Sequence, residues 1–497
     1  MRPLRILLVL AGLGTALAQP TAPAVRQLSL EDCIRSALEK NLDIRVARYT
    51  PALALSDLRG AYAGYDPGFS IDGRHNFNMS GGGFNPSIST FIQPTSADQN
   101  TFNSSLGGLL PSGLNYSLSG NVSESYGRNP SPFDQSGGRA LLTLQQPLLK
   151  NFWIDQTRYS IKVAKNRLKY SELTLKQQIM QTVNAVEQAY YDLIYSRENV
   201  VVQQKAVELA QRLVMENRKR LEVGALAELD VKQAEAQAAS SLAALIRAQQ
   251  TLGTQLEVMK GLIGDDFAAW ANVDLMPTDK LTTERRLFNL QDSWSKALTL
   301  RPDLQQSKLD IERQGVALKY TFNQLFPQLD LVGSYGHNAG GANIREFNES
   351  FQQLQEGSRP LYSYGALLSI PLSNTRARAN YKSSKLTMEQ LLLELKRLEQ
   401  NIITQVHNDV GTIQADFQSV AATRQAREYA EAALDAEQKK LESGKSTTYT
   451  VLQMQRDLTN ARGNEIQAIV AYNKALAQLS FDEGTMLERR AIDVEVK

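Results

Sequence analysis

Few residues of this chain could carry catalysis or bind a metal ion. His75, His337 and His407 are its only histidines, and Cys33 is its only cysteine. Protein zinc sites take three or four His, Cys or carboxylate ligands, and no cysteine or acidic cluster accompanies these histidines in the sequence. We therefore expect His75 and His337 to be surface or rim residues. A single cysteine forms no internal disulfide, so Cys33 is expected to serve as a small apolar residue on a helix.

Two short motifs resemble catalytic signatures but lack their required context. Gly444-Lys445-Ser446 matches the end of a phosphate-binding loop, yet the position of its first glycine holds Lys439 and no strand precedes it. Ser293-x-x-Lys296 has the spacing of an acyl-enzyme signature, but the partner motifs of that class are missing. The residue inventory therefore predicts a protein that is not an enzyme and that holds no cofactor and no metal.

Long polar helices occupy most of the chain. Residues 151–222 contain no proline or glycine, and the later run from Thr375 to Ser443 contains only Gly411. Gly224 and Gly444 then stand where a glycine commonly follows a helix C-terminus, and second helices are expected over 228–262 and 447–479. Apolar residues at three-four spacing predict coiled-coil packing of these helices. The seams are Val202, Ala206, Leu209 and Leu213; Leu245, Ala248, Leu252, Leu256 and Met259; and Leu458, Ala461, Ile469, Tyr472, Leu476 and Leu479.

Shorter elements precede each long helical pair. Residues 28–62 and 290–324 each read as a helix, the first with Ser29 as N-cap and Asp32 three positions on. Pro67 and Pro327 follow these helices and cannot continue them. Alternating apolar and polar residues then predict strands. The strands are expected at 69–74, 114–119, 142–145, 329–334 and 362–370. Their flanking aromatics fit either an outer-membrane barrel or an antiparallel sheet in a soluble protein.

The chain presents this order of elements twice. Ala37-Leu38, Asp43, Pro67 and Gly73 return 260 positions later as Ala297-Leu298, Asp303, Pro327 and Gly333. Such an internal repeat of more than 200 residues predicts a duplicated module that closes a larger structure. The copies differ in length: Pro67 to Pro147 spans 80 positions and Pro327 to Pro371 spans 44, so the first copy has 36 more. We interpret these as an enlarged surface loop or an added hairpin.

The domain organisation follows from the repeat and from the termini. Residues 1–18 contain the basic residues Arg2 and Arg5, then an apolar run, then Ala16-Leu17-Ala18, whose small residues suit a cleavage site. This order predicts a signal peptide that is removed after Ala18. The first repeat is assigned to 19–263, a linker to 264–289, the second repeat to 290–480 and a charged tail to 481–497. The whole chain has 54 basic and 52 acidic residues, which gives no indication of a nucleic-acid partner.

Taken in order, these features resemble the TolC-like outer membrane efflux proteins, also called outer membrane factors. The features that carry the resemblance are Leu30-x-x-Cys33-Ile34-x-x-Ala37-Leu38-x-x-Asn41, the repeated Pro67 and Pro327, Gln146-Pro147-Leu148, and Arg220-Leu221-Glu222-Val223-Gly224-Ala225 with Asp230-Val231. The likeness covers essentially all of the sequence after residue 18.

The resemblance implies an α+β membrane protein that assembles as a homotrimer. Each chain would give two strands per copy to a single shared β-barrel in the outer membrane, in contact with its lipid. A long α-helical coiled-coil tunnel would continue the barrel into the periplasm. Such proteins resemble passive porin-like channels, which receive cargo from an inner-membrane pump through a periplasmic adaptor (membrane fusion) protein. The 36 extra residues depart from the two-strand count.

The resemblance also implies a gate at the periplasmic tip. Asp230 matches the acidic position of the first copy, and Glu228 precedes it by two residues. In the second copy, Thr450 and Gln453 stand where the family prototype has pore aspartates. Leu441 and Ser446 replace a tyrosine and an arginine that help to close the prototype's tip. These four departures imply a gate whose charge is weaker or differently placed.

Both parts of the tip keep simpler interpretations. Three carboxylates around a narrow pore would bind cations, but Asp230 is equally a solvated acid that favours the helix dipole. The turns Val223-Gly224-Ala225 and Ser443-Gly444-Lys445 match the family region that meets the adaptor, and they are also expected helix caps.

The resemblance favours the exit duct of a tripartite efflux or type I secretion system. A coiled-coil structural or adhesive surface protein is the alternative, although it would not need strands repeated in phase with the helices. A periplasmic enzyme lacks support from the residues. Drugs, metal ions and polypeptides stay open as cargo, and the pump class stays open with them.

Overall fold

The computed structural model describes residues 24–87, 89–129, 131–341 and 344–492, so the predicted signal peptide lies outside the described residues. Two compact units make up the chain. One unit comprises 1–46, 178–297 and 404–493, and the other comprises 47–177, 298–403 and 494–497. We call them the hairpin unit and the sheet unit, and each is described by itself.

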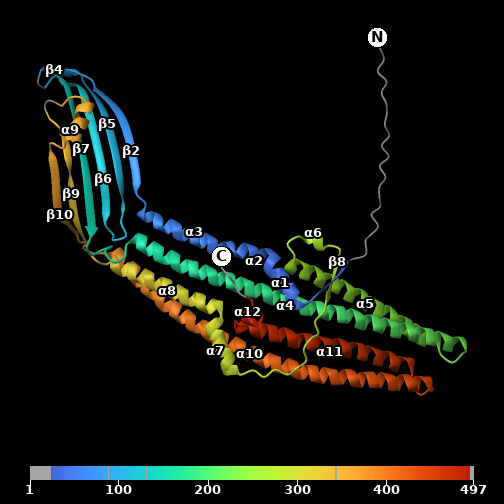
Figure 1. Ribbon diagram of the computed structural model, residues 1–497. Coiled ribbons are helices and arrows are strands. Elements are labelled where there is room, and N and C mark those ends of the chain that lie inside the picture. Colours follow the sequence, from blue (N-terminus) through green and yellow to red (C-terminus); the bar gives the residue numbers. More distant parts are fainter. Residues whose placement is uncertain (1–23, 88, 130, 342–343, 493–497) are drawn as a thin grey trace, which may run out of the picture. The chain divides into compact units, whose positions relative to one another are not determined.

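The four predicted long helices are confirmed. They are α4 (Gln156–Glu222), α5 (Glu228–Ile263), α10 (Thr375–Glu442) and α11 (Thr448–Asp482). In the hairpin unit, α4 from residue 178 onward forms one antiparallel pair with α5, and α10 from residue 404 onward forms another with α11 (Figure 1). No helix in the described ranges combines the length and the apolarity needed to cross a bilayer.

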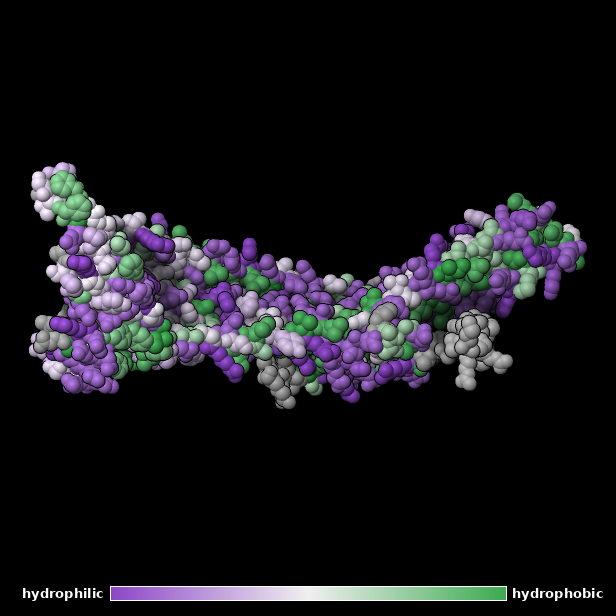
Figure 2. Space-filling model, turned by 90° about the horizontal axis from the view of Figure 1, so that it is seen from above, coloured by the Kyte–Doolittle hydropathy of each residue, from purple (hydrophilic) through white to green (hydrophobic). Residues whose placement is uncertain are grey.

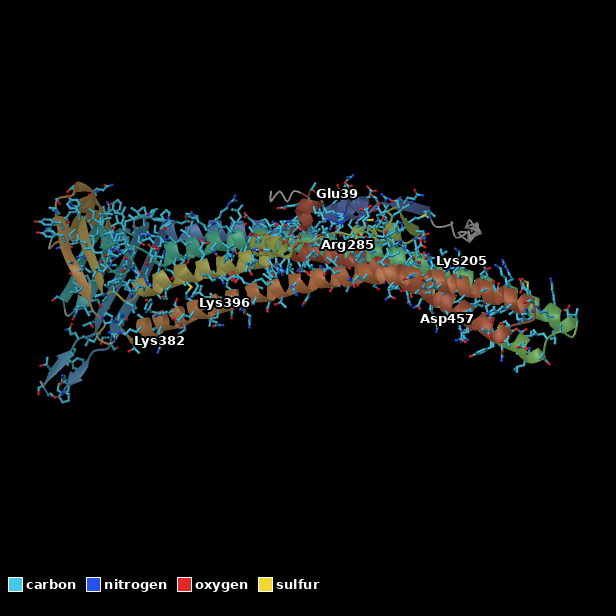
Figure 3. All side chains as sticks on the ribbon, turned by 90° about the horizontal axis from the view of Figure 1, so that it is seen from below. Glu39, Lys205, Arg285, Lys382, Lys396 and Asp457 are labelled. Carbon is cyan, nitrogen blue, oxygen red and sulfur yellow. The ribbon has the colours of Figure 1, made fainter. Side chains whose placement is uncertain are left out.

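The apolar seams of these helices form the core of the hairpin unit. Every residue of the three predicted seams is buried or half-buried, which confirms the three-four pattern. The most deeply buried side chains include Val183, Val186, Tyr190, Val406, Ile413, Tyr472 and Leu479. On the face shown in Figure 2, hydrophobic patches along the helices are broken up by hydrophilic ones. Lys205 and Asp457, both exposed, project from the helices into solvent (Figure 3).

Short elements cross this helical core. Strands β1 (Ala24–Leu28) and β8 (Val273–Pro277) pair in parallel, and α6 (Phe267–Trp270) precedes β8 in the predicted linker. The Asp279 carboxylate accepts hydrogen bonds from the Leu30 amide at 2.6 Å and from the Tyr190 hydroxyl at 3.0 Å. A short helix, α12 (Met486–Arg489), completes the unit, and Arg490 behind it pairs with the buried Glu187 at 2.7 Å.

The prediction of one continuous helix over 28–62 and another over 290–324 is wrong. The first is divided into α1 (Leu30–Lys40), α2 (Leu42–Ala47) and α3 (Tyr49–Ala61), with the 3₁₀ turn η1 (Tyr62–Tyr65) after them. The second is divided into α7 (Leu290–Leu300) and α8 (Pro302–Asn323). The predicted N-cap is confirmed, because Ser29 and Asp32 form a reciprocal capping box.

The break between α1 and α2 and the break between α7 and α8 each have a physical cause. Asn41 leaves the helical conformation. Its side-chain Nδ2 donates to the Leu262 carbonyl at 3.0 Å, and its side-chain Oδ1 accepts from the backbone amide of Asp43 at 2.9 Å. Arg301 takes an extended ψ of 125° because Pro302 follows it and disfavours the helical region for the preceding residue. The breaks lie 260 positions apart, the spacing of the sequence repeat.

The sheet unit contains one antiparallel sheet of six strands in the order β10-β9-β7-β6-β5-β2 (Figure 1). Its strands are β2 (Gly68–Ser80), β5 (Thr95–Leu109), β6 (Asn115–Asn129), β7 (Ser131–Pro147), β9 (Gln328–Gly340) and β10 (Pro360–Ser369). A separate ribbon pairs β3 (Gly83–Asn85) with β4 (Thr90–Ile92). The implied count of two strands per copy is therefore wrong for the first copy, which places four strands in this sheet.

The two faces of the sheet differ in polarity. One row across all six strands consists of Phe69, Leu106, Leu118, Leu142, Tyr335 and Tyr362, and this face we call the apolar face. A row on the opposite, polar face holds Asp72, Asn103, Asn121, Arg139 and Asn338. Hydrogen bonds join neighbours along it, including Asn103 to Asp72 at 3.0 Å and Arg139 to Asn338 at 3.2 Å.

A helix that the sequence analysis missed covers part of the apolar face. It is α9 (Phe347–Glu356), which follows β9 and lies over β7 (Figure 1). Phe347 packs edge-on against Phe102 with ring centroids 6.4 Å apart, and the fully buried Ser350 hydroxyl donates to Ser136 at 2.8 Å. The helix thus anchors the connection between β9 and β10 to the sheet.

Candidate functional site at the tips of the helical hairpins

The two hairpin turns have the same backbone structure. In each, the helix ends in a glycine with positive φ, +73° at Gly224 and +75° at Gly444. The Ala225 amide donates to the Arg220 carbonyl and the Lys445 amide to the Lys440 carbonyl, both at 2.8 Å. These bonds define a Schellman cap, which satisfies carbonyls that the helix end leaves unpaired. The prediction that glycine ends both arms is confirmed.

The exposed residues of the two turns are those predicted to face an adaptor. Val223, Gly224, Ala225, Ser443, Gly444 and Lys445 are all exposed, and the Val223 side chain is 78% exposed. An apolar side chain that stands in solvent at a turn gains nothing from its own fold. It is available to a partner surface.

Beneath the turns, the two hairpins pack against each other. Their shared core consists of Leu213, Leu434, Leu441, Val451, Leu452 and Leu458. Polar contacts flank it: the Asn217 amide donates to the Thr448 hydroxyl at 3.4 Å, and Arg220 donates to the Leu441 carbonyl at 3.2 Å. The ends of α4, α10 and α11 therefore share one core at the tip, and Leu441 is a core residue rather than a pore residue.

The four predicted gate residues occupy the beginnings of α5 and α11. Glu228 is exposed and Asp230 is half-buried in the first turn of α5, where both carboxylates favour the helix dipole. Thr450 is half-buried and Gln453 is exposed on α11. Thr450 completes an N-cap, because its amide donates to the Thr447 hydroxyl at 3.3 Å. Each of the two helices thus brings one half-buried polar side chain to its first turn.

One acidic residue of the tip was missed by the sequence analysis. The Ser446 hydroxyl donates to the Glu437 carboxylate across the turn, and Lys440 donates to the same carboxylate at 3.0 Å. The Ser446 hydrogen bond first, and that from Lys440 second, lower the pKa of Glu437 below its ordinary value. The only sequence signal was the Glu-x-x-Lys spacing of 437 and 440, which is common on helix surfaces.

A second carboxylate that accepts two charged hydrogen bonds lies near the turn of the other hairpin. Glu235 on α5 accepts from Arg218 on α4 at 2.6 Å and from Lys232 at 3.2 Å. The hydrogen bond from Arg218, and then that from Lys232, lower the pKa of Glu235. Near its turn, each hairpin therefore has a carboxylate that accepts hydrogen bonds from neighbouring residues, Glu235 from Arg218 and Lys232, and Glu437 from Ser446 and Lys440. Asp230 and Glu228 take no part in these hydrogen bonds.

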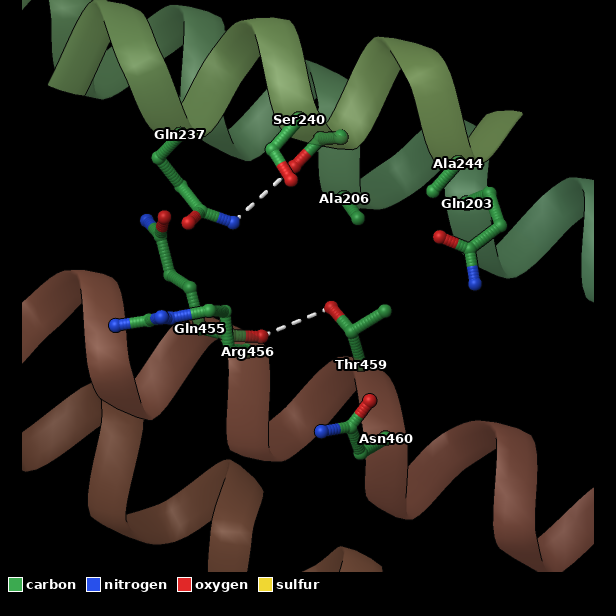
Figure 4. Close-up of a pocket in the computed structure, with 10 residues that line it drawn as sticks. Gln203, Ala206, Gln237, Ser240, Ala244, Gln455, Arg456, Thr459 and Asn460 are labelled. Atoms are coloured by element: carbon green, nitrogen blue, oxygen red, sulfur yellow. Dashed lines mark hydrogen bonds between the residues drawn. The ribbon is translucent and has the colours of Figure 1, made fainter. Parts of the chain in front are cut away.

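A polar cavity lies between the hairpins, above the tip core. Its volume is about 190 Å³, and it is lined by Gln203, Ala206, Gln237, Ser240, Ser241, Ala244, Gln455, Arg456, Thr459 and Asn460 (Figure 4). Gln237 donates to Ser241 at 3.4 Å, and Thr459 donates to the Gln455 carbonyl at 2.8 Å. These lining side chains include no acid, histidine or cysteine, so the cavity has no general base and no metal-binding set.

Two of the histidines lie on strands of the sheet, His75 on β2 and His337 on β9. His75 contacts Asn100 at 2.8 Å and lies 3.5 Å from Asp98 on the sheet, and His337 packs against Tyr335. Within the described ranges, no group of three or more His, Cys, Asp or Glu side chains is placed to hold a metal ion.

Comparison with known proteins gives a family match over most of the sequence. The model of the outer membrane efflux proteins matches residues 107–265 and 294–482. The chain is 24% identical over 358 residues to the outer membrane efflux protein BepC of Brucella suis biovar 1, covering 71% of the chain and 73% of that protein. It is 25% identical over 405 residues to the proteases secretion protein PrtF of Dickeya chrysanthemi, covering 77% and 81%.

Solved structures share the fold. The CmeC outer membrane channel of Campylobacter jejuni aligns with a TM-score of 0.65 at 16% identity, covering 92% of this chain and 86% of that one. The outer membrane protein VceC of Vibrio cholerae aligns with a TM-score of 0.67 at 18% identity, covering 92% and 96%.

Proposed function

Because the chain belongs to the outer membrane efflux protein family, we propose that it is the exit duct of a tripartite efflux or type I secretion system. It is an outer membrane protein that reaches into the periplasm, and its relatives are named for efflux and secretion. In the proposed system it is a passive conduit, and an inner-membrane pump and a periplasmic adaptor supply energy and cargo.

The observation that carries this proposal is the sheet with one apolar face and two open edges. Within the part of the chain that the structure describes, strands β2 and β10 have strand neighbours on one side only, so a row of backbone groups on each has no partner in the sheet. A bilayer offers those groups no hydrogen-bond partner, and only a closed barrel satisfies them. We infer that copies of the chain join edge to edge, as a homotrimer, with the part of the apolar face that α9 leaves uncovered toward lipid and the polar face toward a water-filled lumen.

The tip of the hairpin unit supplies the proposed gate. Three copies of Asp230 and Glu228 around a narrow passage would attract cations and repel anions. Neither carboxylate takes part in the salt bridges of Glu235 and Glu437, so the negative charges of Asp230 and Glu228 can act on ions in the passage. Thr450 and Gln453 add uncharged polar groups on α11, which makes this gate weaker in charge than one with four acids.

The exposed turns supply the proposed adaptor contact. Val223 and its counterpart Ser443 stand beside the two glycines, and their exposure supports a docking role beyond helix capping. Gly224→Arg should abolish export while trimers still assemble. Normal export by this variant would count against the contact, and loss of trimers would show only that the cap was damaged.

Planar-bilayer recording of the purified protein tests the duct. The proposal predicts discrete channels that multivalent cations block from the tip side. Asp230→Ala should weaken that block, whereas Asp457→Ala, an exposed acid more than two turns into α11, should leave it unchanged. A complete absence of channels would favour the alternative of a structural or adhesive surface protein. Channels with unchanged block in Asp230→Ala would reject the gate alone.

A further inference from the structure

The two copies of the repeat build different numbers of strands from equivalent beginnings. Strand β2 (Gly68–Ser80) and strand β9 (Gln328–Gly340) lie 260 positions apart at both ends. Strand β9 pairs directly with β10, with 19 residues, 341–359, between them. Strand β2 is instead separated from β7 by 50 residues, 81–130, and the hairpin β5-β6 lies between them in the sheet. The first copy is thus a two-stranded unit that has been opened to admit a hairpin.

The inserted hairpin is a full part of the sheet. Its strands pair along the whole of β2 on one side and most of β7 on the other. Both of its faces continue those of the neighbours: Leu106 and Leu118 lie in the apolar row, and Asn103 and Asn121 lie in the polar row. A surface loop would not need this alternation, because only a strand has two faces with a period of two.

The number of strands also suits closure with further copies. In an antiparallel sheet of six strands, the two edge strands β2 and β10 run in opposite directions. Edge β2 of one copy can therefore pair antiparallel with edge β10 of the next, so the alternation continues around the ring. We propose that three copies of this chain form one barrel of 18 strands, six from each, instead of the 12 implied by two strands per repeat. This inference rests on the proposed function, which supplies the trimer.

The added strands widen the outer exit. With strands about 4.8 Å apart and tilted by about 40°, a barrel of 18 strands has a backbone radius of about 18 Å, against about 12 Å for 12 strands. The cross-section of the lumen is then about twice as large by the same geometry. A lumen of this size and polarity holds a hydrated polypeptide with secondary structure, so the barrel is not the step that limits cargo size.

Engineered disulfides test whether the hairpin lies in the barrel wall. Ser70 on β2 faces Ser105 on β5 with hydroxyl oxygens 2.8 Å apart, and Ser334 on β9 faces Ser363 on β10 at 2.7 Å. In a Cys33→Ala background, Ser70→Cys with Ser105→Cys should oxidise as completely as the reference pair Ser334→Cys with Ser363→Cys. Oxidation of the reference pair alone would overturn the proposal, because β5 would then lie outside the wall.

Polymer exclusion measures the width directly. Polyethylene glycols of graded size, added on the barrel side of a planar bilayer, lower the channel conductance only if they enter the lumen. The proposal predicts entry of polymers too large for a 12-stranded barrel. A variant that lacks residues 95–129 should exclude those polymers if it folds.

The outcomes separate the inference from the function on which it rests. Channels of the intact protein that exclude polymers at the 12-strand limit would overturn the wide barrel and leave the duct in place. An absence of channels or trimers would overturn the duct itself. If the deletion variant does not assemble, the polymer cut-off of the intact protein and the disulfide pair still decide the question.

Discussion

Cys33 lies on the buried face of α1. Its side chain is 2% exposed, and burial, followed by the charges of Asp32 and Asp279, raises the pKa of its thiol from 9.0 to about 12. The folded protein therefore keeps a proton that the unfolded chain loses between these values, and this group lowers stability as the pH rises through that window. At pH 8 the thiolate fraction is roughly a thousandfold below that of a free cysteine.

We predict that maleimide does not label Cys33 in the folded protein at pH 8. Ser443→Cys, at an exposed turn, supplies the reference rate, and labelling of Cys33 should reach that rate in denaturant. Rapid labelling of native Cys33 would show that α1 opens, and would contradict its place in the core.

The tie between Ser446 and Glu437 predicts a pH response at the tip. The pKa of Glu437 is lowered in the folded state. The hydrogen bond from Ser446 therefore stabilises the fold at pH values above the ordinary pKa of Glu437, and this stabilisation is lost as the pH falls through the lowered pKa. We expect Ser446→Ala to raise the pKa of Glu437 and to shift any acid-induced opening of the channel to higher pH. The measurement is conductance against pH, and the control is Ser443→Ala, whose hydroxyl bonds only backbone carbonyls of its own helix. Identical curves of conductance against pH for the intact protein and Ser446→Ala would show that the hydrogen bond from Ser446 does not control the titration of Glu437 at the tip.

Helix α4 is followed by Gly224, whose backbone is in the left-handed region. Gly224→Ala should destabilise the cap by about 1 kcal/mol, because a β-carbon is strained at this φ. Local opening of the turn should then become about fivefold more frequent, visible as faster amide exchange over 219–225. Gly224→Asn, whose short polar side chain tolerates this conformation, should change exchange less. Equal exchange in the alanine variant and the intact protein would mean that the turn is not held in the Schellman form.

The sequence predicted the ends of the long helices to within five residues and the strands unevenly. The helices lack proline and glycine over long runs, and positive-φ glycines end two of them, so local chemistry sets their limits. Strands β2 and β9 were predicted because Phe69, Ile71, Leu329 and Leu331 alternate with polar residues. Strand β5 was missed because most of its residues are polar on both faces, and only its neighbours show which face lies toward the apolar side.

Other elements depend on partners that are distant in sequence. The break at Asn41 requires the Leu262 carbonyl, and α9 requires the apolar face beneath it. At the tip, the turn glycines were predictable from their positions after helices. The Ser446 to Glu437 bond was not, because it joins two ordinary polar residues across a turn.

For the whole molecule, the open sheet is the feature that requires association of copies. Within the described residues the sheet has two edges without strand partners, and the helices expose many polar side chains along faces that a tunnel would turn toward water. A single chain leaves the edge groups of the sheet without the hydrogen-bond partners they need in a membrane. Association of copies around one axis supplies those partners and lets the polar helix faces line a tunnel.

The most direct test is a particle reconstruction of the protein purified from outer membranes into lipid nanodiscs, computed first without imposed symmetry. The account predicts three chains around one axis, with a single barrel in the lipid made from the sheets of all three and a helical tunnel outside it. Separate barrels for each chain, or a helical bundle with no barrel in the lipid, would contradict it.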